Sequence, residues 1–126
     1  MNSKKRFGCL GENFAKGYVK RKGYKILFSP FRCRIGEIDL IAKDDDTLVF
    51  IEVKTRKNLY FGTPLEAVTP RKQRQIVRVA KYFLHHVNRE NFQSARFDVI
   101  GITQPKGSNE PEIIHVLDAF RDDSGI

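Results

Sequence analysis

The sequence lacks any apolar run that approaches the ~20 residues needed to cross a membrane. Its basic beginning, MNSKKRFGCL, is not followed by a long apolar segment, so we expect no signal peptide. Internal repeats, low-complexity stretches and a linker between two cores are also missing, which argues against a repeat array or a two-domain chain. With 126 residues, 40% of them apolar, we predict one soluble domain over residues 1–126, located in the cytoplasm and with no membrane partner.

Cysteine is also scarce. The two cysteines, Cys9 and Cys33, do not have the spacing of metal ligands, which argues against a cysteine-based metal site. We expect two reduced, partly buried thiols, as is usual for a cytoplasmic protein, rather than a disulfide.

Acidic residues are outnumbered, because 15 Asp and Glu face 23 Lys and Arg, giving a net charge of +8. The excess is concentrated in residues 1–25, which carry +7, and in residues 70–96, which carry +6. Residues 26–69 carry −1 and residues 97–126 carry −4. Two basic segments around a near-neutral middle indicate a surface for a polyanion, with nucleic acid the first candidate. The alternative is a solvated basic surface that serves solubility alone.

Apolar periodicity and turn residues predict an α/β fold. Helices are expected at residues 10–23 and 70–86, the second with Thr69 as its N-cap and Pro70 in its first turn. Strands are expected at residues 24–28, 37–43, 48–54, 95–103 and 113–120. Because these strands are rich in Val, Ile and Phe on both faces, we predict a central sheet of about five strands covered by helices, in the order αβββαββ.

The second and third strands form a hairpin whose charged residues fall in register. A turn centred on residues 45–46 places Asp39 opposite Glu52, and Glu37 opposite Lys54. Opposed Cβ atoms in such a pair lie about 4.5–5.5 Å apart. An odd-length loop or a bulge would shift these pairs.

Two facing carboxylates on a half-apolar face repel each other and need compensation. A divalent cation such as Mg²⁺ or Mn²⁺ would relieve the repulsion between Asp39 and Glu52, and so would a shared proton. Lys54, two residues after Glu52 on the same face, can reach an anion bound there. The alternative is a solvated charged face in which Glu37 and Lys54 form an ordinary ion pair.

Two polar residues on the helices point toward the same sheet. Glu12 is spaced to share the inward stripe of Ala15 and Val19, and Gln73 is spaced to share that of the second helix. Either residue is also compatible with a polar helix end near solvent. Tyr60-Phe61, in the following loop, is more typical of packed aromatics than of a contact with bases or sugars.

Together these motifs resemble a known family. The segments GENFAKGYVKRKGY, GEIDLIA, FIEVKTR, TPRKQRQIVRVAKYFL and RFDVI resemble the bacterial YraN-like family of predicted endonucleases over residues 8–117. That family resembles the PD-(D/E)XK nuclease superfamily and is thought to be related to archaeal Holliday-junction resolvases. Ile38 stands where the superfamily pattern has proline, and Asp39 keeps its acid.

The resemblance implies a restriction-endonuclease-like fold with a mixed central sheet. It identifies Asp39, Glu52 and Lys54 as the catalytic motif and Glu12 as the helix carboxylate. Gln73, or its neighbour Lys72, would complete the site. Glu37 and Asp98 also match the family pattern, without an assigned role.

The implied activity is metal-dependent hydrolysis of phosphodiester bonds in branched or duplex DNA, in repair or recombination. Mg²⁺ or Mn²⁺ would be bound by Asp39, Glu52 and the Val53 carbonyl, with Glu12 holding a water or a second metal. Cleavage of a junction would favour a two-fold homodimer. The residues expected to hold DNA phosphates are Lys16, Lys20, Arg56, Lys57, Arg71, Lys72 and Arg74.

The rival function is a nucleic-acid-binding protein that keeps the nuclease fold and cleaves nothing. RNA is a third candidate ligand, but the sequence contains no RNA-binding aromatic motif.

Overall fold

The computed structural model describes residues 3–56, 62–104, 107 and 109–122, with side chains from Leu10 onward. Its elements are α1 (Ser3–Arg21), β1 (Lys25–Phe28), β2 (Phe31–Cys33), β3 (Gly36–Ile38), β4 (Leu40–Asp44), β5 (Thr47–Arg56), α2 (Pro70–His86), β6 (Ser94–Thr103) and β7 (Glu112–Phe120). Among the described residues, no helix is long and apolar enough to cross a membrane.

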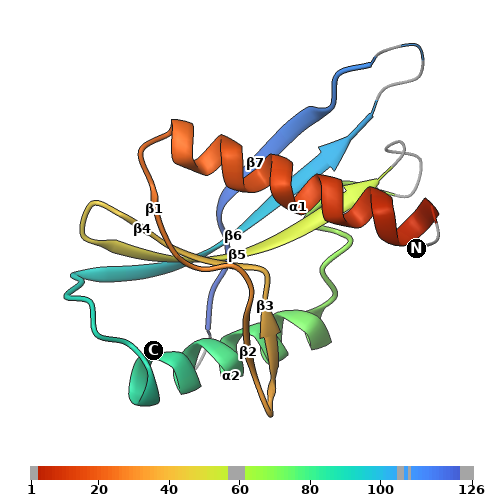
Figure 1. The fold of residues 1–126 in the computed structure, drawn as a ribbon. Coiled ribbons are helices and arrows are strands. Elements are labelled where there is room, and N and C mark those ends of the chain that lie inside the picture. The colour runs from red at the N-terminus through yellow and green to blue at the C-terminus, as the bar shows by residue number, and fades with distance from the viewer. Residues whose placement is uncertain (1–2, 57–61, 105–106, 108, 123–126) are drawn as a thin grey trace.

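Five strands form the central sheet, in the order β1-β4-β5-β6-β7. The β5–β6 pair is parallel and the other neighbours are antiparallel. α1 lies on one face of the sheet and α2 on the other (Figure 1). The predicted fold class, a restriction-endonuclease-like mixed sheet of about five strands flanked by helices, is confirmed.

Alternation along β5 divides the apolar side chains between two cores. Leu48 and Phe50 pack into the core under α2, whereas Val49, Ile51 and Val53 pack into the core under α1. The strand is therefore covered on both faces, as its continuous apolar sequence predicts.

α2 begins where its capping residues predict. The Thr69 hydroxyl accepts a hydrogen bond from the backbone N–H of Lys72 at 3.2 Å, and Pro70 occupies the first turn. The helix ends at His86, and Ile76, Ala80 and Phe83 are among the residues of its buried stripe. The predicted span of this helix is confirmed.

α1 begins at Ser3, earlier than the predicted residue 10, and its buried side includes Gly11, Ala15 and Val19. A Cβ added at Gly11 would lie 2.5 Å from Oγ1 of Thr55. Only glycine therefore allows α1 to lie this close to the last residues of β5, where the charged residues of the hairpin are found.

The predicted hairpin register is confirmed between Asp44–Thr47 and Ile41–Phe50. The predicted single strand at 37–43 is wrong, because the chain bends at Asp39 and separates β3 from β4. β3 instead pairs with β2, a strand that the sequence analysis did not predict.

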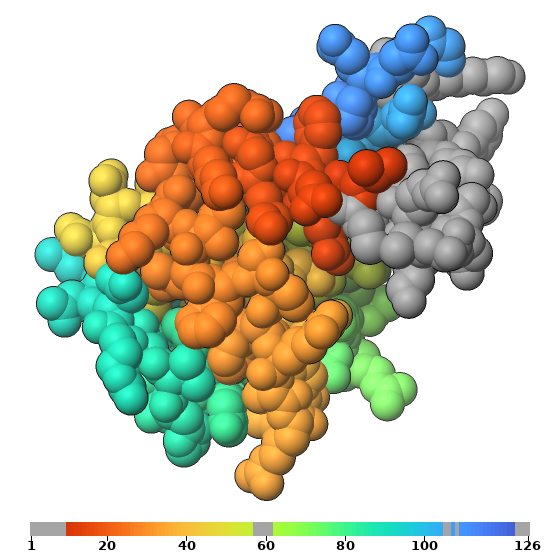
Figure 2. Space-filling model, in the orientation of Figure 1, coloured from red at the N-terminus to blue at the C-terminus, as the bar shows by residue number. Residues whose placement is uncertain are grey.

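The small β2–β3 sheet is fixed against α2. Phe31 is buried, Cys33 and Ile35 pack against the α2 core, and Nε2 of Gln75 donates to the Ile35 carbonyl at 3.2 Å. Figure 2 shows this hairpin (orange) projecting at the lower edge of the molecule. Cys33 is a free, half-buried thiol, as expected; the Cys9 side chain lies outside the described residues.

Candidate active site

The bend at Asp39 brings its side chain onto β5. One carboxylate oxygen of Asp39 accepts a hydrogen bond from the backbone N–H of Val53 at 2.8 Å. The backbone pairing between β4 and β5 ends at Leu40–Ile51. Asp39 is thus hydrogen-bonded to β5 through its side chain at the point where the backbone pairing stops. This bond holds the carboxylate beside β5, just beyond the end of the β4–β5 pairing.

Glu52 lies next to this carboxylate and is only 7% exposed. The pKa of Glu52 is raised to about 8, first by burial and then by the charge of Asp39 and a hydrogen bond to Asp39. The two carboxyl groups predicted to face each other are therefore together. A proton on Glu52 or a cation would relieve their repulsion, and these are the two forms of compensation expected from the sequence.

The predicted pairing of Glu37 with Lys54 is wrong. Glu37 belongs to β3, and its carboxylate accepts from Nε of Arg32 on β2 at 2.8 Å. The bend at Asp39 turns Glu37 away from β5, so the two-residue alternation that predicted this pair is interrupted. Both partners of the Arg32–Glu37 pair are exposed, and the pair links the two strands of the projecting hairpin.

Two lysines approach the carboxylate pair. Lys72, from the first turn of α2, and Lys54, from β5, each lower the pKa of Glu52, but burial and Asp39 outweigh them. Gln73 instead donates from Nε2 to the Val68 carbonyl at 3.0 Å, which closes the turn before α2. Of the two α2 residues considered from the sequence, Lys72 is the one that acts on the site.

Glu12 is exposed, so the prediction that it shares the buried stripe of α1 is wrong. Its spacing from Ala15 places it at the margin of that stripe. Partial burial and then the charges of Asp39 and Glu37 raise the pKa of Glu12, while Arg32 opposes them. Glu12 therefore lies within the electric field of the carboxylate pair.

The donor set suits a hard divalent cation. Among residues 10–56, 62–104, 107 and 109–122, no three His, Cys, Asp or Glu side chains are grouped to hold a metal. Mg²⁺, however, is usually bound through only one or two carboxylates and keeps several waters. The buried Glu52 and the half-buried Asp39, whose charges repel each other more than Lys54 and Lys72 compensate, fit that requirement.

The basic residues expected to hold phosphates lie on both helices and on β5. Lys57, expected to hold a phosphate, and Tyr60-Phe61, expected to be packed aromatics, lie outside the described residues. The described ones are Lys16 and Lys20 on α1, Arg56 at the end of β5, and Arg71, Lys72 and Arg74 on α2.

A second buried carboxylate, Asp98 on β6, is fully satisfied. Nε2 of His115 lies 2.7 Å from one of its oxygens, while Nε of Arg96 and the backbone N–H of Asp118 donate to the other at 3.0 and 2.9 Å. Burial would raise the pKa of Asp98, but these hydrogen bonds outweigh it and hold the pKa below its ordinary value.

This cluster reaches α1, because Nδ1 of His115 lies 3.0 Å from the Tyr18 hydroxyl. Asp98 therefore helps to fasten α1 across the sheet. The sequence analysis noted Asp98 without a role and did not identify Tyr18 or His115. The available signal was a charged residue in each of two apolar strands, RFDVIGIT and IIHVLDAF.

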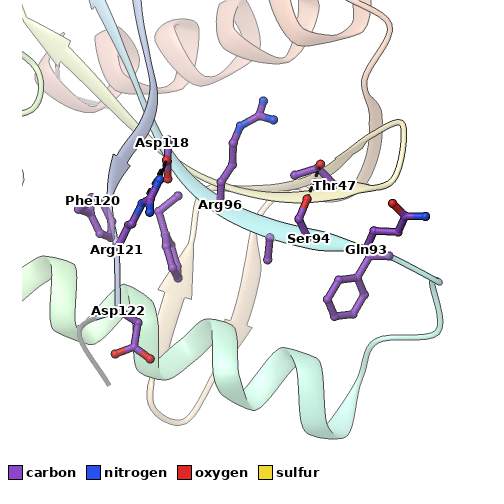
Figure 3. A pocket seen from close by; sticks show the side chains of 11 residues that line it. Thr47, Gln93, Ser94, Arg96, Asp118, Phe120, Arg121 and Asp122 are labelled. Atoms are coloured by element: carbon purple, nitrogen blue, oxygen red, sulfur yellow. Dashed lines mark hydrogen bonds and ion pairs between the residues drawn. The ribbon is translucent and has the colours of Figure 1, made fainter. Parts of the chain in front are cut away.

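A hollow of about 610 Å³ lies elsewhere, at the start of β6 and the end of β7 (Figure 3). Among its lining residues, Thr47 contacts Ser94 and Arg121 pairs with Asp118. Glu52 and Lys54 do not line it. Asp39 and Lys72 do not line it either, so this hollow is separate from the Asp39–Glu52 pair.

The model of the uncharacterised protein family UPF0102 matches residues 11–102. A UPF0102 protein of Geotalea daltonii is 50% identical over 119 residues, which cover 94% of this chain and 92% of that protein. One of Caldicellulosiruptor bescii is 47% identical over 117 residues, or 92% and 98% of the two chains. The UPF0102 protein GSU0650 of Geobacter sulfurreducens is 46% identical over 116 residues, or 92% and 89%.

Proposed function

The chain belongs to the uncharacterised protein family UPF0102, and from its site we propose a metal-dependent endonuclease that hydrolyses phosphodiester bonds in DNA. The observation that carries the proposal is the buried Glu52 carboxyl against the half-buried Asp39, with Lys54 and Lys72 beside the pair. A buried pair of carboxylates is costly unless a cation or proton compensates it, so a functional reason for keeping both is expected.

Asp39 and Glu52 would hold Mg²⁺ or Mn²⁺, together with the Val53 carbonyl. When bound, such a cation lowers the pKa of a coordinated water and neutralises charge that develops on a phosphate. The Val53 N–H fixes one Asp39 oxygen, and the cation would take the place of the proton in the hydrogen bond between Glu52 and Asp39.

The remaining residues would position the substrate. Lys54 carries three donors on a flexible stem, which suits it to orient the attacking water or to stabilise charge on the phosphate. Lys72 would hold a neighbouring phosphate oxygen from the α2 side. Glu12, exposed but within the field of Asp39, would hold a water on the α1 side. This assignment supports membership of the PD-(D/E)XK superfamily.

Branched DNA is the substrate we propose first, in repair or recombination. Two strands of a junction would be cut by two sites, which a two-fold homodimer would present. The alternative is a protein that binds nucleic acid and cleaves nothing. Such a protein would bind nucleic acid through the same basic surface but would not require a metal.

The test is incubation of the protein with labelled linear, flapped and four-way DNA, with Mg²⁺, with Mn²⁺ and with EDTA. We expect metal-dependent cleavage that is fastest on a branched substrate. Binding of all three DNAs without cleavage under either metal would support the alternative and overturn the endonuclease proposal.

A further inference from the structure

One side of α2 carries three arginines, Arg71, Arg74 and Arg78, which we call the α2 arginine row. Their spacing of three and four residues places them on one side of the helix, and all three are exposed. None has a hydrogen bond or ion pair with another residue in the part of the chain that the structure describes. Lys81, one turn further on, is by contrast paired with Asp122 at 2.9 Å.

The row is not explained by the stability of the helix. α2 contains no acidic residue, and its first two turns carry Arg71, Lys72 and Arg74. The N-terminal end of a helix has a partial positive charge, so cations there are unfavourable and acids are favoured. Cations at this end therefore oppose the helix dipole, which indicates that they are kept to bind an anion.

Two hollows lie along the row. One, of about 630 Å³, is lined by Thr69, Arg71, Lys72, Arg74, Gln75 and Arg78. The other, of about 420 Å³, shares Arg74 and Arg78 and extends to Arg121. Because Arg74 and Arg78 line both hollows, the row forms a ridge of guanidinium groups between them. Lys72, which lines the first hollow, is close enough to Glu52 for the two charges to interact, so the row begins beside the candidate site.

We propose that the α2 arginine row binds consecutive backbone phosphates of a nucleic-acid strand and directs that strand along α2, away from the Asp39–Glu52 pair. The identity of the polyanion rests on the proposed function. Arg71 and Arg78 are separated by about 10.5 Å along the helix axis. This is more than the axial rise of about 3.4 Å between neighbouring phosphates of one strand, so the row can contact more than one phosphate. Guanidinium groups bind phosphates bidentately and do not read bases, so the row is expected to bind independently of sequence.

The test is the salt dependence of binding, measured by fluorescence anisotropy in EDTA with a labelled 30-base-pair duplex. The variant is Arg71→Gln/Arg74→Gln/Arg78→Gln. Its matched control, Arg21→Gln/Arg34→Gln/Arg89→Gln, removes the same charge from exposed positions outside α2. Each lost phosphate contact lowers the slope of log K against log salt by about 0.9 for a duplex. We expect the slope to fall by about two to three in the row variant and by less than about one in the control. Circular dichroism verifies that both variants are folded.

Equal slopes in the two variants would contradict the proposal that the α2 arginine row binds phosphates. A wild-type protein that does not bind the duplex at low salt would contradict it as well. Because EDTA prevents metal-dependent cleavage, the result is independent of catalysis. If wild type cleaves DNA but the row variant has the same slope as wild type, the endonuclease proposal stands and the proposal for the α2 arginine row fails. If the row variant has a lower slope but wild type does not cleave DNA, the proposal for the α2 arginine row stands and the endonuclease proposal fails.

Discussion

Asp39 accepts a hydrogen bond from the backbone N–H of Val53 across 2.8 Å, at the point where the β4–β5 ladder ends. The chain bends at Asp39 between β3 and β4, and this bond keeps the Asp39 carboxylate on β5. The carboxylate is thereby held against Glu52, whose own burial makes the pair unfavourable when both are ionised.

The first prediction concerns pH and stability. The pKa of Glu52 rises from its ordinary value of 4.5 to about 8 in the folded protein. The stabilisation from its proton is therefore fully present below about pH 4.5 and is lost as the pH rises through about 8. We predict that Glu52→Gln is more stable than wild type at pH 9 in EDTA, by on the order of 2–4 kcal/mol, and nearly equal at pH 5. Urea unfolding measures the difference, with the exposed Glu112→Gln as control. A difference that does not change with pH would contradict the shifted pKa.

The second prediction concerns metal binding without catalysis. Mg²⁺ or Mn²⁺ competes with the proton shared by Asp39 and Glu52, so each should raise the melting temperature more at pH 8 than at pH 5.5. A ligand at 100 times its Kd stabilises by about 2.7 kcal/mol, which is several degrees for a domain of this size. Differential scanning fluorimetry measures the shift. Asp39→Asn should abolish it, because the amide can still accept from Val53 but lacks the charge. An equal shift in that variant would place the metal elsewhere.

The third prediction concerns the buried cluster around Asp98. Asp98→Asn removes the counter-charge of Arg96 and the partner of His115, so we expect a loss of about 3–5 kcal/mol. The folded-state pKa of Asp98 is lowered, so its contribution is present above its ordinary pKa and is lost as the pH falls through the folded value. The gap between wild type and variant in urea unfolding should narrow in strong acid. The exposed Asp46→Asn is the control. A loss below about 1 kcal/mol would show that the cluster does not fasten α1.

A fourth prediction separates stability from binding on α2. Arg71→Glu places an acid in the first turn, where it favours the helix dipole, and should stabilise the protein by about 0.3–1 kcal/mol. The same change should weaken DNA binding, because it replaces a phosphate contact with a like charge. Thermal unfolding and anisotropy titrations measure the two effects. Weaker binding together with lower stability would indicate damage to the helix instead.

Local signals were enough to predict most of the fold. Thr69 and Pro70 marked the start of α2, and the acidic turn at 45–46 fixed the hairpin register. The bend at Asp39 was not predictable, because a side chain in place of a backbone partner leaves no periodic signal. β2 was missed because it is short and, among the described strands, pairs with β3 alone.

The candidate site was predicted in part. Asp39 and Glu52 come together as alternation predicted, although the pairing of Glu37 with Lys54 depended on an uninterrupted strand. The Asp98 cluster could not be derived from spacing, since Tyr18 and His115 are 97 residues apart in sequence. Only the packing of α1 against the sheet brings them together.

The most direct test of the central claim is the initial rate of Mg²⁺-dependent cleavage of a four-way DNA junction by wild type, Asp39→Asn and Asp45→Asn. Asp45 lies in the hairpin turn with φ of 51°, a conformation that asparagine tolerates, so its variant makes the same chemical change away from the site. We predict cleavage by wild type and Asp45→Asn at similar rates, and a loss of at least about 100-fold in Asp39→Asn. Equal cleavage by Asp39→Asn and wild type, or no cleavage by wild type, would contradict the account.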